Sequence, residues 1–148
     1  MEIFIDTEQQ TEVLARWIAE VLPTRALVFL QGDLGAGKTS FARALIRTLS
    51  GDVDLPVPSP TFTLLQHYDT AQGPVWHFDL YRLQDPEEIF ELGWEDALAA
   101  GRVLVEWPER LGPHAPVDHF TITLKRGEPD APTSRIMTLD DKLGELLT

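Results

Sequence analysis

Residues 32–39 read Gly-Asp-Leu-Gly-Ala-Gly-Lys-Thr and match the pattern G-x-x-x-x-G-K-[ST] at every fixed position. A continuous apolar run of strand length, residues 26–30, precedes them. The next segment, residues 38–49, repeats apolar residues at the spacing of a helix with one buried face. A buried strand, a glycine-rich turn and a helix in this order predict a phosphate-binding loop, or P-loop.

The glycines of this loop predict a backbone that curls around an anion. They let successive N–H groups converge on phosphate oxygens, and the helix that follows adds its positive N-terminal end. We expect Lys38 to reach the β and γ phosphates and to be exposed when the loop is empty, and the Thr39 hydroxyl to ligate Mg²⁺. The residues predicted to bind the nucleotide here are Gly32, Asp33, Leu34, Gly35, Ala36, Gly37, Lys38, Thr39 and Ser40.

A P-loop NTPase also needs an acidic residue at the end of a strand, where the carboxylate holds or orients Mg²⁺ and its waters. Residues 103–106 form an apolar strand that ends in Glu106, the usual context for such an acid. Residues 75–79 end in Asp79, but they alternate more and predict a half-exposed strand. The pattern alone leaves both acids as candidates.

The preferred base is indicated by a missing motif. GTPases of the Ras type read guanine with the sequence [NT]-K-x-D. Here Lys125 is preceded by Leu124 and followed by Arg126 and Gly127. Adenine is therefore favoured, so that ATP or ADP is the expected nucleotide.

The remaining patterns predict an α/β fold: a single three-layer P-loop NTPase domain over residues 1–148, with a mixed, mainly parallel sheet and antiparallel hairpins. Thr7 and Gln10 fit a capping box that starts the first helix. Its apolar stripe includes Trp17. The expected strands are residues 2–5, 26–30, 62–68, 75–81, 102–107, 120–124 and 135–139, and the expected later helices are residues 38–49, 86–92, 94–99 and a short one at the C-terminus.

Charge and hydropathy exclude several classes of function. The chain has 24 Asp and Glu against 12 Lys and Arg, a net charge of −12. Proteins that bind nucleic acid need a basic footprint, so we expect no DNA binding and only indirect contact with RNA. No stretch approaches the roughly 18 apolar residues of a membrane span, and the acidic N-terminus does not resemble a signal peptide. We expect a cytoplasmic protein without membrane contact.

Four blocks of residues resemble the TsaE (YjeE) family of small bacterial ATPases. They are the P-loop, residues 59–64 (Ser-Pro-Thr-Phe-Thr-Leu), residues 77–83 (His-Phe-Asp-Leu-Tyr-Arg-Leu) and residues 106–108 (Glu-Trp-Pro). The blocks occur in the family's order and spacing, and the resemblance spans about residues 7–110. The P-loop alone is generic, whereas the other three blocks together are specific.

The resemblance implies a role in making threonylcarbamoyladenosine, a modified base beside the tRNA anticodon. The family member binds the TsaB–TsaD complex, and its ATP hydrolysis supports repeated turnover by TsaD, so that tRNA is reached only indirectly. Thr39 and Glu106 then match Mg²⁺ ligands, and Asp79 matches an acid important for hydrolysis. Thr61 lies in a segment that resembles a switch able to sense the γ-phosphate. With Lys38, Asp79 and Thr61 are the expected catalytic residues.

Three further residues correspond to family positions around the nucleotide. Trp107 matches an aromatic side chain near the nucleotide, Thr11 a polar residue near the base, and Arg135 a late basic residue that contacts the nucleotide. The histidines show no metal-ligand spacing and are expected to be structural or exposed; they are His67, His77, His114 and His119.

Two other functional classes remain open at this point. The P-loop also suits a small-molecule kinase that acts on nucleotide-like substrates, although such enzymes place several arginines in a mobile lid, and here the arginines are scattered. The chain could also be a nucleotide-regulated interaction module that does not hydrolyse ATP.

Overall fold

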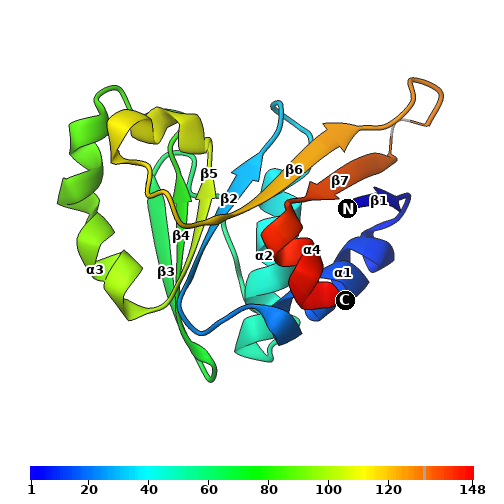
Figure 1. Ribbon diagram of the computed structural model, residues 1–148, viewed down its shortest axis with the longest axis horizontal. Helices are drawn as coiled ribbons and strands as arrows, with labels where there is room; N and C mark the ends of the chain where they lie inside the picture. The colour runs from blue at the N-terminus through cyan, green and yellow to red at the C-terminus, as the bar shows by residue number, and fades with distance from the viewer. Residues whose placement is uncertain (132) are drawn as a thin grey trace.

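The computed structural model describes residues 1–131 and 133–148 and arranges them around one seven-stranded sheet (Figure 1). The strand order is β1-β7-β6-β2-β5-β4-β3. The central strands β6, β2, β5 and β4 run parallel, whereas β7, β1 and β3 each pair antiparallel with their neighbours. In chain order the elements are β1 (Glu2–Ile5), α1 (Glu8–Val21), β2 (Ala26–Gln31), α2 (Lys38–Ser50), β3 (Leu65–Thr70), β4 (Gly73–Asp79), η1 (Pro86–Leu92), α3 (Trp94–Ala100), β5 (Arg102–Glu106), η2 (Pro108–His114), β6 (Phe120–Arg126), β7 (Arg135–Leu139) and α4 (Asp141–Leu147).

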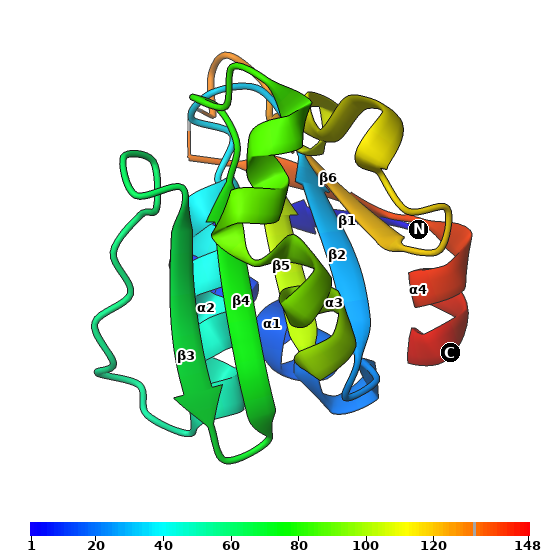
Figure 2. The same ribbon diagram turned by 90° about the vertical axis from the view of Figure 1, so that its left-hand side faces the viewer.

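Helices cover both faces of the sheet, which makes three layers. One buried cluster joins α1, α2 and α4 to the sheet, and a second joins η1, α3 and η2 to the opposite face. Figure 2 shows α3 in front of the strands and α2 behind them. The predicted three-layer fold with a mainly parallel sheet and antiparallel hairpins, β3–β4 and β6–β7, is confirmed. Across residues 1–131 and 133–148, no helix is both long and apolar enough to cross a membrane.

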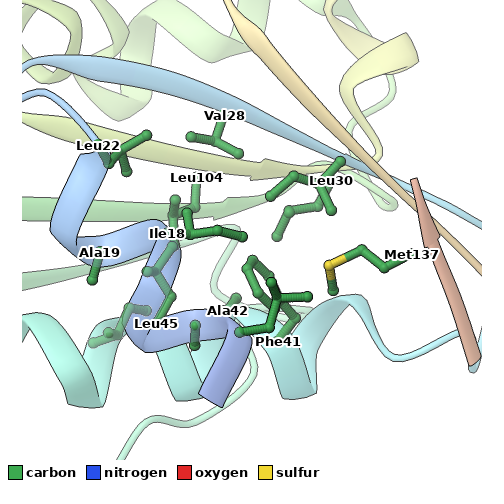
Figure 3. Packing of buried hydrophobic residues seen from close by; sticks show 14 of the residues in the cluster. Ile18, Ala19, Leu22, Val28, Leu30, Phe41, Ala42, Leu45, Leu104 and Met137 are labelled. Carbon is green, nitrogen blue, oxygen red and sulfur yellow. The ribbon is translucent and has the colours of Figure 1, made fainter. Parts of the chain in front are cut away.

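The larger cluster fixes α2 on the sheet (Figure 3). Phe41 and Leu45 of α2 pack with Ile18 of α1 and Leu104 of β5, and all four are fully buried. Burial of each such side chain contributes about 1.5–3 kcal/mol. The capping box of Thr7 and Gln10 at the start of α1 is confirmed. Because this packing holds α2 along its length, its N-terminus is fixed at the carboxyl end of β2.

Three expected strands, β2, β5 and β6, differ by one or two residues at their C-terminal end, and the two strands of the β3–β4 hairpin differ at both ends. The strand expected over residues 62–68 starts at Leu65, because the preceding residues form a turn that the Leu64 N–H closes on Pro60 O at 2.7 Å. Phe62 is 78% exposed, so its β propensity is overridden by the turn. The strand expected over residues 75–81 ends at Asp79 and is buried rather than half exposed, since β3 and β5 flank it and helices cover both faces. Trp17, expected on the buried stripe of α1, is 55% exposed.

Candidate active site

The P-loop follows β2 directly and lies at the carboxyl edge of the parallel strands. Three of its glycines have positive φ, and two of them also lie tightly against neighbouring residues. Gly32 has φ 147° and lies against Leu124 O, so it has no room for a Cβ. Gly35 has φ 80°, a backbone conformation that strains any other residue, and lies against the Arg126 guanidinium. Ala36 is buried under the loop, and its N–H donates to Asp33 O at 3.0 Å. The loop therefore has the compact turn that an anion nest requires.

Lys38 is buried at 5% exposure, so the expectation of an exposed side chain is wrong. Its ammonium donates to Gly32 O and lies 3.5 Å from the centroid of the Trp107 ring. Trp107 has a left-handed backbone (φ 59°), uncommon for a residue other than glycine, directly after β5. Burial lowers the pKa of Lys38, although the charges of Glu106 and Glu109 act in the opposite direction.

Thr39, Glu106 and His77 form a chain of side-chain contacts from α2 into the sheet. The Thr39 hydroxyl donates to Glu106 Oε1 at 2.8 Å, and His77 Nε2 lies 2.7 Å from Glu106 Oε2. The side chains of His77 and Glu106 are 0% and 2% exposed. The predicted Mg²⁺ ligands Thr39 and Glu106 are thus brought together. His77, expected to be structural or exposed, is buried against one of them.

Asp79 lies beside Glu106, because β4 and β5 are parallel and pair these two residues in register. Burial raises the pKa of Asp79, and the charge of Glu106 raises it further; the Tyr81 N–H, at 3.0 Å from Oδ1, opposes this shift. The Thr61 hydroxyl donates to Asp79 Oδ2 at 3.2 Å. The turn before β3 therefore attaches the switch-like segment directly to an acid of the site.

A cavity of about 870 Å³ opens beside the P-loop, between α1 and α2. Its lining includes four of the residues predicted to contact the nucleotide, Thr11, Gly37, Ser40 and Arg135. Arg135 also donates to Gly35 O at 3.4 Å. The cavity is within the volume range of small-molecule sites and extends along α2 as far as Gly51. These four residues, predicted from separate parts of the chain, thus line one cavity.

Two residues of this site were missed by the sequence reasoning. Arg126 donates to Leu34 O at 3.0 Å and pairs in register with Arg135. Its position at the end of an apolar strand gave no signal, because the contact joins residues 92 positions apart. His77 could have been found, because it precedes Asp79 by two residues and so shares its face of the strand.

The residues present fit a magnesium nucleotide. Mg²⁺ in nucleotide sites is held by hydroxyl and carboxylate oxygens together with phosphate oxygens and water, and the Thr39 hydroxyl and the Glu106 carboxylate lie side by side. The loop backbone and the start of α2 provide N–H groups for phosphates. Asp33 and Leu34 are exposed at the tip of the loop, where the Leu34 carbonyl accepts a hydrogen bond from Arg126.

Comparison with known proteins gives a consistent result. The family model described as "Threonylcarbamoyl adenosine biosynthesis protein TsaE" matches residues 5–136. A Rickettsia felis relative named tRNA threonylcarbamoyladenosine biosynthesis protein TsaE is 46% identical over 107 residues, which are 72% of this chain and 62% of the relative. The chain thus spans less than two thirds of that relative's length.

A Nostoc relative of the same name is 33% identical over 99% of this chain and 91% of its own. The crystal structure of YdiB from Bacillus subtilis superimposes with a TM-score of 0.74 at 25% identity, covering 99% of this chain and 90% of that one. The family match extends from β1 to β7 and includes every residue of the site described above. The chain belongs to the TsaE family.

Proposed function

We propose that this protein is a Mg²⁺-dependent ATPase that acts with the TsaB–TsaD complex in the cytoplasm to support threonylcarbamoyladenosine formation in tRNA. The observation that carries the proposal is the meeting of Lys38, Thr39, Asp79 and Glu106 at the carboxyl edge of the sheet. Membership of a family whose relatives are named for this biosynthesis supports the biological role.

The nucleotide would lie along the P-loop with its nucleoside in the adjoining cavity. The backbone of residues 32–40 would hold the phosphates, and Lys38 would exchange its contacts with Gly32 O and Trp107 for phosphate oxygens. Thr11 and Arg135 line the cavity on the nucleoside side. Arg126 holds Leu34 O and so fixes the outer half of the loop.

Asp79 is the group best placed to accept a proton from an attacking water. Burial raises its pKa, which brings a carboxylate closer to the basicity that such a role requires. The Thr61 hydroxyl orients Oδ2, and the Tyr81 N–H orients Oδ1. A Mg²⁺ ion held at Thr39 and Glu106 would neutralise charge that develops on the phosphate oxygens.

The partner complex would act through the segment that contains Thr61. This residue is attached to Asp79 on one side and to Ser59 at 2.7 Å on the other, in a turn that follows a proline-rich loop. A partner that shifts the turn would therefore move a hydrogen-bond donor to Asp79, the proposed general base. The net charge of −12 agrees with tRNA being held by the partners.

The test measures ATP binding by calorimetry, ATP hydrolysis with and without purified TsaB–TsaD, and tRNA modification in the same mixture. We expect ATP to be preferred over GTP, and hydrolysis and modification to require the partner complex. Tight binding without hydrolysis in the full mixture would make the protein a regulatory module. Phosphoryl transfer to nucleosides or shikimate-like acceptors would make it a kinase.

A further inference from the structure

His77 is fully buried in the middle layer of the protein, although its imidazole is polar. It lies in β4 between Val75 and Asp79, on the face of the sheet that α2 covers. Its Nδ1 atom has no hydrogen-bond partner within the described residues. Burial of a polar group without a partner is costly, so packing alone would favour an apolar residue here.

The contact of His77 with Glu106 accounts for its presence. An ionised carboxylate can only accept hydrogen bonds, so that His77 Nε2 carries the hydrogen and donates it to Oε2 at 2.7 Å. The Thr39 hydroxyl donates to the other oxygen, Oε1, at 2.8 Å. The carboxylate is therefore held by one donor from β4 and one from α2, and its plane is fixed from both sides.

This arrangement also orients Thr39. A hydroxyl that donates its hydrogen to Glu106 keeps its oxygen lone pairs free for a cation. Without the donor from β4, the Glu106 carboxylate could turn towards other donors, and the Thr39 oxygen would lose its fixed direction. Loss of a partner that orients a metal ligand typically weakens metal binding 10- to 100-fold.

We propose that His77 is a positioning residue for the magnesium site, holding Glu106 so that Glu106 and Thr39 present their oxygens together. The proposal rests on the proposed function, because it takes Thr39 and Glu106 as Mg²⁺ ligands. It gives the histidine of the block at residues 77–83 a role separate from that of Asp79, which contacts Thr61 and Tyr81 instead.

The experiment measures ATP affinity by calorimetry in Mg²⁺ and in EDTA, and the ratio of the two affinities is the gain due to Mg²⁺. His77→Met fills the space without a donor and should reduce this gain at least about tenfold. His77→Gln keeps a donor nitrogen near the Nε2 position and should stay within about threefold of wild type. Affinity in EDTA should be unchanged in both variants.

Two controls separate positioning from packing. His67 is a partly exposed histidine on β3, and its Nε2 atom lies 3.6 Å from Asp69 Oδ1. The substitution His67→Met should leave the gain in ATP affinity due to Mg²⁺ unaltered. In a Glu106→Gln background, His77→Met should cause no further loss, because its effect passes through Glu106.

The proposal is overturned if His77→Met keeps the wild-type gain, whatever it does to the melting temperature. It is also overturned if His77→Gln loses the gain as fully as His77→Met. If His77→Met does not fold, His77→Asn replaces it, because its shorter amide cannot reach Glu106. Equal gains from Mg²⁺ for the His77→Asn and His77→Gln variants then refute the proposal. A wild-type protein that binds no ATP in either buffer would instead refute the proposed function, and this proposal with it.

Discussion

Replacing Asp79 by asparagine should stabilise the fold while it slows the proposed hydrolysis. Asp79 is 3% exposed, and burial raises its pKa above the ordinary value of 3.8, with Glu106 adding to the shift. The folded protein therefore holds this proton more tightly than the unfolded chain does. Ionised Asp79 destabilises the native state, and this penalty grows as the pH rises from 3.8 through the folded pKa.

Asparagine removes the charge and keeps an oxygen that can accept from the Tyr81 N–H. A single stabilising substitution commonly gains about 0.5–2 kcal/mol. For a domain of about 150 residues, 1 kcal/mol shifts the melting temperature by about 2–4 °C. We expect Asp79→Asn to melt about 1–8 °C higher than wild type at pH 7, with the difference vanishing below pH 3.8. Turnover should fall about 10²-fold or more, the usual contribution of a general base.

Thermal unfolding followed by circular dichroism across this pH range, together with partner-stimulated ATP turnover, tests both expectations. Asp69→Asn, on an exposed side chain of β3, is the matched control and should change neither quantity. An Asp79→Asn protein that melts below wild type at pH 7, or whose stability difference does not depend on pH, would refute the reasoning from burial.

Three further substitutions test the other contacts of the site. Lys38→Ala should lower ATP affinity about 10- to 150-fold, as expected when a charged donor to phosphate is lost, and unchanged affinity in calorimetry would contradict the P-loop assignment. Thr61→Ala should reduce partner-stimulated turnover more than basal turnover, because it removes a donor to Asp79; equal losses in steady-state assays would exclude a switch role. Arg126→Gln should weaken ATP binding about tenfold, because it releases Leu34 O, whereas Lys125→Gln should not weaken it. Similar ATP affinities for the two variants would show that Arg126 has no role in nucleotide binding.

Features that depend on neighbouring residues were predictable from the sequence. The P-loop, its preceding strand and α2 follow from a local motif flanked by two hydrophobic periodicities, and the capping box at Thr7 needs only the next three residues. The pairing of Thr39 with Glu106 was reached through the family resemblance, because the strand pattern alone left Asp79 as a second candidate. In each case the sequence pattern lies in the same element, or in the same known combination of elements, as the structural feature that it predicts.

Features that depend on distant residues were not predictable. Asp79 is buried because β3 returns to cover the outer edge of β4, which the alternation of β4 itself does not indicate. Lys38 is buried because Trp107, 69 positions later in the chain, has a left-handed backbone conformation and places its ring over the Lys38 ammonium. The turn before β3 overrides the strand propensity of Phe62 through a backbone hydrogen bond from Leu64 to Pro60. These outcomes are decided by tertiary packing, against the local pattern.

The buried polar side chains separate a structural role from a functional one. Among the described residues they are Lys38, His77, Asp79, Arg102 and Glu106. Arg102, at the amino end of β5, donates to the carbonyls of Leu22 and Gln72 and so ties α1 to the β3–β4 turn, which explains it by structure alone. The other four meet at the opposite, carboxyl edge, where burial disfavours the charged forms of both Lys38 and Asp79. Charged groups whose burial weakens the fold are retained where a ligand needs them. The increase in the free energy of unfolding caused by Asp79→Asn would measure how much stability the ionised Asp79 costs.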